Sequence, residues 1–331
     1  MKIFVTGGSG YCGSMLVPML LQDGHHVTVF DVMYFGFEHL PNHERLDIIE
    51  GDIRNAPLLE SKARDHDIFI SLACISNDAS FELDEKLSTS INLDAFEPMV
   101  VAAKNAGCRR FIYASSSSVY GVSDAPDVTE DHPLVPLTLY NKYKGMCEPL
   151  LSRHTDENFV GVTFRPATVC GYAPRLRLDL SVNILTNHAI NKNKITVFGG
   201  SQLRPNLHVA DYCDAVRLLM DAPDELIADE IFNVGYENKS INDIALIVKR
   251  VVEEEFPEKA PIEIVRTESD DNRSYHINSD KIYRILGYKP KRTIDDAVKD
   301  LCEAFKEGKI PNSFDDDIYF NVKRLLNHRA T

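Results

Sequence analysis

The feature that most constrains the fold is a glycine-rich loop between a strand-like run and a helical run at the start of the chain. The run KIFVT leads into GGSGYCG, and a helical pattern follows from about Tyr11 to Gln22. Glycines at such a junction permit a tight turn and let the backbone approach a phosphate, which the N-terminus of the helix attracts. Two registers overlap, Gly8-Gly10-Gly13 and Gly7-Gly10-Gly13, and either one is able to hold a dinucleotide.

The rest of the first third repeats the alternation of strand and helix patterns. The strand-like runs HVTVFD, LDIIEGD, HDIFISLA and RRFIYAS follow one another with helical patterns between them. This alternation predicts an α/β fold with a doubly wound parallel sheet of the Rossmann type, whose ligand crevice lies at the carboxyl ends of the strands. We expect a dinucleotide-binding domain over residues 1–170, its sheet completed by segments near 205–235, and a smaller α/β lobe over residues 171–331 that binds the substrate.

Composition excludes several other classes. A net charge of −14 and a pI near 5.2 disfavour a nucleic-acid binder, which would carry a basic patch. The seven cysteines contain no C-x-x-C pair, so we expect reduced thiols and no metal site. The start MKIFVTGG lacks the pattern of a signal peptide, and no apolar run approaches a membrane span, so we expect a cytoplasmic protein.

An acid follows the glycine loop at the spacing that a ribose requires. Asp31 ends the run HVTVFD, 18 positions beyond Gly13, close to the spacing of about 20 at which an acid accepts from the ribose 2′-hydroxyl. The next residues are Val32, Met33 and Tyr34, so no adjacent cation would compensate a 2′-phosphate. The pattern therefore favours NAD over NADP.

A second motif supplies candidate chemistry. Tyr140 and Lys144 are four positions apart in a helical pattern and therefore share one face. The same spacing recurs by chance at Tyr319 and Lys323, but only Tyr140 follows a serine run, residues 115–118. A polar turn is the alternative interpretation of that run. An ammonium near a phenol favours the phenolate, so we expect Lys144 to help Tyr140 accept a proton during hydride transfer.

Together these motifs resemble a known family. In chain order they are TGGSGYCG, Asp31, GDIR at 51–54, SSSSVYG, YNKYK, RPATVCG, HVAD and DNRSYHINSDKIYRILGYKP. The chain is similar over nearly its whole length to the extended short-chain dehydrogenase/reductases of the nucleotide-sugar epimerase and dehydratase group, which includes UDP-galactose 4-epimerase. In that family the register with Gly7, Gly10 and Gly13 is the one that binds the dinucleotide.

The resemblance also implies roles for individual residues. Those expected to act in catalysis are Tyr140, Lys144 and Ser116. Those expected to bind NAD are Gly7, Gly10, Tyr11, Cys12, Gly13, Asp31, Asp52, Ile53, Leu72, Ala73, Asn92, Ser115, Tyr140 and Lys144. Those expected to bind a nucleoside-diphosphate sugar are Ser116, Ser117, Ser118, Asn183, Arg175, Arg204 and Arg273, with Arg177 as a further candidate.

The implied activity is NAD-dependent oxidation at C4 of a nucleoside-diphosphate sugar, first of all as a 4-epimerase of the kind that acts in polysaccharide biosynthesis. Ser117 and Ser118 stand where the 4,6-dehydratases of the family carry an acid, so we expect no dehydratase. One alternative is a net 4-dehydrogenase, as in GDP-heptose oxidation, that recycles NADH with a 2-oxo acid. Another is a non-catalytic NAD sensor. Cys170 replaces a common tyrosine and is expected to reshape the sugar pocket.

Relatives of this kind often form homodimers through two long helices, which would lie near 86–106 and 140–153. The first is apolar at Phe96, Met99, Val100 and Val101, so we expect a homodimer. The alternative is a helix whose apolar face is covered by the chain's own sheet and second lobe.

Overall fold

Seven parallel strands form the central sheet of the computed structural model, which describes residues 1–123, 125–268 and 274–329. Their order is β3-β2-β1-β4-β5-β6-β10, and every neighbouring pair runs parallel. The strands are β1 (Lys2–Thr6), β2 (His26–Asp31), β3 (Leu46–Glu50), β4 (Ile68–Ser71), β5 (Arg110–Ala114), β6 (Val160–Pro166) and β10 (Glu230–Val234). The order reverses between β1 and β4, where a doubly wound sheet opens its ligand crevice. The predicted Rossmann fold is confirmed.

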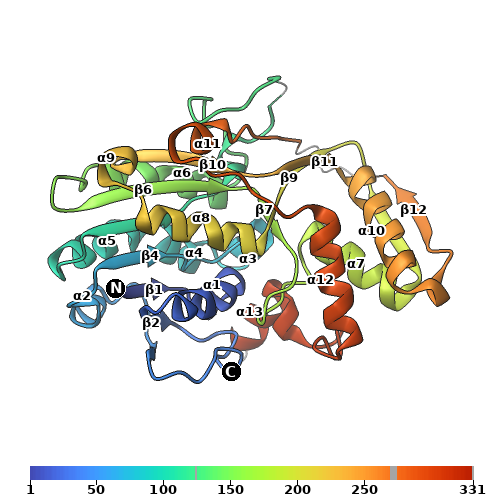
Figure 1. The fold of residues 1–331 in the computed structure, drawn as a ribbon, viewed down its shortest axis with the longest axis horizontal. Coiled ribbons are helices and arrows are strands. Elements are labelled where there is room, and N and C mark those ends of the chain that lie inside the picture. Colours follow the sequence, from blue (N-terminus) through green and yellow to red (C-terminus); the bar gives the residue numbers. More distant parts are fainter. Residues whose placement is uncertain (124, 269–273, 330–331) are drawn as a thin grey trace.

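Helices cover both faces of this sheet (Figure 1). One face carries α1 (Tyr11–Gln22) and α8 (Val209–Asp221), and the other carries α2 (Ala56–Ala63), α5 (Phe96–Asn105) and α6 (Leu139–Ser152). Within β1, Ile3 and Val5 pack in the first core, whereas Phe4 packs in the second. Because successive side chains of a strand point to opposite faces and both faces are covered, the interior positions of the central strands are apolar in succession instead of alternating.

Stacked phenylalanines fill the second core. Phe4 and Phe69 are directly paired on β1 and β4, with ring centroids 5.2 Å apart, and Phe69 pairs with Phe111 of β5 at 4.9 Å. Phe96, Met99 and Val100 of α5 are buried in this same core, so they are not free for a partner as the dimer expectation assumed. Val101 is the exposed apolar residue among the four.

A smaller lobe of two short sheets lies at one end of the large sheet (Figure 1). Its strands are β7 (Thr168–Cys170), β9 (Leu203–His208) and β11 (Glu237–Ser240) in one sheet, and β8 (Lys194–Phe198) with β12 (Glu263–Thr267) in the other. Its helices are α7 (Ser181–Lys192), α10 (Ile241–Glu255) and α12 (Ile294–Lys306), which enclose a third core. Within residues 205–235 the chain alternates between the lobes, because β9 pairs with β7 whereas α8 and β10 pack on the large sheet.

The remaining helices are short or terminal. They are α3 (Asp78–Glu82), α4 (Glu85–Thr89), α9 (Asp224–Ile227), α11 (Asp280–Leu286) and α13 (Asn321–Arg329). Within residues 1–123, 125–268 and 274–329, no helix has the length and apolar character to span a bilayer. All seven cysteines are unpaired.

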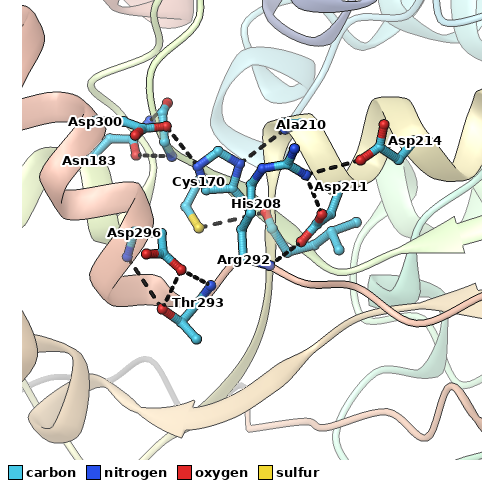
Figure 2. Close-up of polar contacts among 12 residues, drawn as sticks. Cys170, Asn183, His208, Ala210, Asp211, Asp214, Arg292, Thr293, Asp296 and Asp300 are labelled. Carbon is cyan, nitrogen blue, oxygen red and sulfur yellow. Dashed lines mark hydrogen bonds and ion pairs between the residues drawn. The ribbon is translucent and has the colours of Figure 1, made fainter.

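A polar cluster fastens α12 to the start of α8 (Figure 2). The Ala210 N–H donates to His208 Nδ1 at 3.1 Å, so the Nε2–H of this ring donates to Asp300, 3.0 Å away. Arg292, just before α12, bonds Asp211 and Asp214 of α8. The HVAD segment therefore joins the two lobes, and His208 and Asp211 lie outside the cavities described below.

Candidate active site

Two adjoining cavities lie between the large sheet and the smaller lobe. The first, of about 380 Å³, is lined by the glycine loop and by residues at the carboxyl ends of β2, β4 and β5. The second, of about 520 Å³, reaches into the smaller lobe between α7 and β8. The residues that line both are Asp78, Ser118, Asn141, Thr168, Leu180 and Tyr275. A ligand in one cavity would therefore meet a ligand in the other at these residues.

The glycine loop uses one register to face the first cavity. Gly7, Gly10 and Gly13 line it, whereas Gly8 packs against the Val29 side chain. Gly7 has φ +73°, and a Cβ there would lie 2.6 Å from the Ala73 backbone nitrogen. No described side chain caps the first turn of α1, so its N–H groups and positive dipole end are available to an anion.

Carboxylates stand at the next two strand ends. Asp31 accepts from the backbone N–H groups of Ser9 and Met33, both at 3.0 Å, and burial raises its pKa. Asp52 follows β3, is paired with Arg54, and lines the cavity beside Ile53. Asp31 is therefore fixed by the loop it faces, with a carboxylate edge in the cavity.

Tyr140 and Lys144 reach the first cavity from the start of α6, which Thr138 caps through the Asn141 N–H. The Lys144 ammonium donates to the Ala114 carbonyl at 2.7 Å and lies over the Tyr113 ring. Burial raises the pKa of Tyr140 well above its usual value, and the cation that most opposes the rise is Arg177. The expectation that Lys144 favours the phenolate stays a prediction; the structure shows that its ammonium lines the same cavity and donates to the Ala114 carbonyl.

The serine run divides between cavity and core. Ser118 donates to Asn141 Oδ1 at 2.5 Å, so the 2.7 Å contact between Ser116 and Ser118 is a bond that Ser116 donates. Ser115 donates to Glu148, which forms a buried ion pair with Arg165. Ser117 is fully buried and lines neither cavity. Ser115, Ser116 and Ser118 thus share the first cavity with Tyr140.

Two predicted ligand residues serve as buried amides instead of lining a cavity. Asn92 accepts from the Ile75 N–H at 2.8 Å and donates to its carbonyl at 2.9 Å, which fixes the loop after β4. Asn183 accepts from the Gly171 N–H at 3.0 Å and donates to the Arg177 carbonyl at 2.8 Å. Asn183 is fully buried, so its amide orients the loop that carries Arg177.

The arginines predicted to bind the substrate do not line one common cavity. Arg204 lines the second cavity, 5.9 Å from the Tyr275 ring. Arg175, expected to bind substrate, instead lines the first cavity, beside Phe35. Arg273 lies outside the described residues. Cys170 lines neither cavity; its thiol donates to the Leu207 carbonyl (Figure 2).

Two further asparagines line the cavities although the sequence analysis did not predict them as site residues. Asn141 follows Tyr140 directly and bonds Ser118, whereas Asn321 reaches the first cavity from the C-terminal helix. Tyr319 and Lys323 line neither cavity, and the Lys323 ammonium donates to the Phe314 carbonyl. Asn141 could have been predicted because it directly follows Tyr140 in the sequence, but nothing in the local sequence points to Asn321.

A Rossmann fold that brings a glycine loop, a strand-terminal aspartate and a Tyr-x-x-x-Lys helix to one cavity defines the short-chain dehydrogenase/reductase class. A model of the "NAD dependent epimerase/dehydratase family" matches residues 3–235. The chain belongs to this family, and its cofactor is NAD. The cavity suits NAD, because Asp31 offers a carboxylate to a ribose and the uncapped turn of α1 suits a diphosphate.

Relatives of similar identity carry out different reactions. The chain is 28% identical to "Low-salt glycan biosynthesis protein Agl12" of Haloferax volcanii, over 90% of this chain and 96% of the relative. It is 26% identical to a UDP-glucose 4-epimerase of Lactobacillus helveticus, over 90% and 95%, and 26% identical to a dTDP-glucose 4,6-dehydratase of Actinoplanes sp., over 93% and 99%. The solved UDP-glucose 4-epimerase of Thermotoga maritima with UDP-glucose has the same fold, with a TM-score of 0.83 and 22% identity over 93% and 99%.

Proposed function

We propose that this enzyme oxidises a nucleoside-diphosphate sugar at C4 and acts as a 4-epimerase. The observation that carries the proposal is the shared wall of the two cavities, where Tyr140 and Ser116 stand beside Ser118 and Asn141. A sugar that enters through the second cavity would present a hydroxyl to the phenol and the serine at this wall. The named relatives that act on UDP-glucose support the substrate class.

The side chains divide the chemistry of one proton transfer. Ser116 bonds the sugar hydroxyl, and the phenolate form of Tyr140 accepts the proton of that hydroxyl. The Lys144 ammonium, fixed by the Ala114 carbonyl, keeps positive charge under this wall. NAD, when bound, would supply the hydride acceptor and, once reduced, the hydride donor, so an epimerase needs no second substrate.

The proposal includes the absence of net dehydration. Elimination of water across C5 and C6 needs a general acid, and the resemblance places that acid where this chain has Ser117 and Ser118. Ser117 is buried outside the cavities, and Ser118 is engaged with Asn141. Among the residues that line both cavities, the carboxylate belongs to Asp78, which accepts a hydrogen bond from the Thr138 hydroxyl.

The test is a panel of UDP-, GDP-, CDP- and dTDP-sugars, each incubated with and without 2-oxoglutarate, with the products assigned by NMR. The proposal predicts a 4-epimer without 2-oxoglutarate. A 4-keto product that accumulates only with 2-oxoglutarate would identify a net 4-dehydrogenase instead. A 4-keto-6-deoxy product would identify a dehydratase, and no turnover of any sugar would favour an NAD sensor.

We also propose a homodimer through α5 and α6. The two helices pack side by side on one face of the sheet and expose Val101 and Met146 at 37% and 42%. Light scattering at micromolar concentration should give a mass twice that of one chain. The double substitution Val101→Glu and Met146→Glu should reduce the measured mass to that of one chain. A monomer for the unaltered chain contradicts the proposal.

A further inference from the structure

Two buried arginines line the first cavity from the smaller lobe. Arg175 and Arg177 lie between β7 and α7 and are 2% and 8% exposed. Both line the first cavity and neither lines the second. Their position therefore associates them with the first cavity, which suits NAD, and not with the second cavity, which reaches into the smaller lobe.

Each arginine has a buried N–H group without a partner among the described residues. Arg177 is paired with Asp179 at 2.9 Å and donates to Ser76, but its Nη2 has no acceptor. Arg175 donates through Nη2 to Asn321 Oδ1 at 2.6 Å and lies 3.5 Å from the Phe35 ring centroid, but its Nε has no acceptor. Unpartnered donors of this kind cost free energy unless a ligand accepts from them.

The charge of Arg175 is also only partly compensated, by the nearby carboxylates of Asp179 and Asp31. No carboxylate of the described residues forms an ion pair with it. Burial, together with the neighbouring Arg177, lowers the pKa of Arg175 to about 9. An anion that entered the cavity would restore the stability of the charged guanidinium, because a buried cation needs a bonded counter-charge.

The backbone places this cation beside the turn where a diphosphate binds. The Arg175 N–H donates to Ser14 Oγ at 3.1 Å, which fixes the arginine segment to the first turns of α1. That helix N-terminus lacks a side-chain cap among the described residues and attracts phosphate. We propose that Arg175 and Arg177 bind the diphosphate of NAD from the smaller lobe, and that Asn321 orients Arg175 for this contact.

Asn321 is tied to the cavity by three bonds. Besides accepting from Arg175, it donates to Ser76 Oγ at 2.8 Å, and its backbone N–H donates to Asp179 at 3.2 Å. Further along α13, Arg324 donates to the Tyr34 carbonyl at 2.6 Å, which anchors the helix to the loop after β2. Asn321 is thus a positioning residue, and the C-terminal helix sets how tightly NAD is held.

The inference rests on NAD dependence and not on the proposed sugar chemistry, so binding alone tests it. The full chain, freed of nucleotide, is titrated by calorimetry with adenosine, ADP, NAD, NADP and UDP. Arg175→Gln should weaken NAD and ADP at least tenfold and change adenosine less than twofold, because only the diphosphate contact is lost. Asn321→Asp, which places a carboxylate on Arg175, should weaken ADP about tenfold without lowering the melting temperature.

Arg110→Gln is the control, since the Arg110 side chain is 11% exposed, is paired with Asp224 and donates to the Leu219 and Ala222 carbonyls, and it lines neither cavity. It should lower the melting temperature and leave the ratio of ADP to adenosine affinity unchanged. The inference is overturned if Arg175→Gln weakens adenosine as much as ADP, if it weakens NADP but not NAD, or if it weakens UDP but not NAD. Should Arg175→Gln fail to fold, an unchanged ADP affinity in Asn321→Asp overturns it equally.

Discussion

The Lys144 ammonium donates a 2.7 Å hydrogen bond to the Ala114 carbonyl oxygen and so ties helix α6 to the carboxyl end of β5. This bond sets the height of α6 above the sheet and, one turn earlier on the helix, the position of Tyr140. It also places the ammonium where parallel strands end, which is where a doubly wound fold binds its ligands.

Replacing Lys144 by methionine should therefore damage both stability and turnover. The substitution keeps an unbranched side chain of similar length but leaves the buried Ala114 carbonyl without its hydrogen-bond donor, which costs about 1–3 kcal/mol. Urea unfolding should show this loss, and kcat should fall at least about 100-fold because the bond that positions Tyr140 on α6 is lost. Unchanged kcat in a folded Lys144→Met variant would remove Lys144 from the mechanism.

The phenol of Tyr140 should titrate above its usual value in the NAD-free enzyme, because burial raises its pKa. The folded state then holds this proton more tightly than the unfolded state, so the associated stability is present below about pH 10 and lost as pH rises further. A difference titration of phenolate absorbance between the unaltered chain and Tyr140→Phe measures the pKa. Titration below about pH 10 would contradict the raised value.

The Glu148–Arg165 ion pair is expected to matter far more than a surface pair. Both side chains are 4% exposed and lie 2.6 Å apart, so Glu148→Gln leaves a buried guanidinium uncompensated and should cost about 3–5 kcal/mol. Glu254→Gln breaks the exposed pair with Arg250 and should change the free energy of unfolding by less than about 1 kcal/mol. Equal effects in denaturant titrations would show that burial does not decide the energy of this pair.

Gly7 and Gly107 form a matched test of the glycine loop. Both have positive φ, but a Cβ on Gly7 would meet the Ala73 backbone at 2.6 Å, whereas a Cβ on Gly107 has open space within 4 Å. Gly107→Ala should cost about 1–2 kcal/mol from backbone conformation alone. Gly7→Ala should cost more and also reduce the amount of NAD that copurifies; retention of NAD at the unaltered level would exclude Gly7 from the cofactor site.

The sequence predicted the parts of this structure that depend on local pattern. Strands buried on both faces show as continuous apolar runs such as IFV within KIFVT, and the crossover helices between them imply a parallel sheet. The pairing of β8 with β12 joins Ile195 to Ile264 across many intervening residues, and no local signal specifies it. Such long-range pairing is decided by tertiary packing.

The same limit applies to the site. Chain spacing located Tyr140, Lys144 and Asp31, because a helical turn or a strand end dictates where such side chains point. Asn183 and Asn92 are polar residues within apolar patterns, and a sequence does not reveal whether a buried amide bonds a ligand or the backbone. The sequence does not reveal that Arg175 lines the first cavity, because the path of its loop beside α1 is set only in the folded chain.

The role of Tyr140 is tested most directly by Tyr140→Phe, which removes one oxygen and keeps the ring that lines the NAD cavity. With the best nucleoside-diphosphate sugar of the panel, kcat should fall about 10²- to 10⁴-fold while the NAD content of the purified protein stays at that of the unaltered chain. Turnover at the unaltered rate with full NAD content would contradict the account, because a group other than the Tyr140 phenol would then accept the sugar proton.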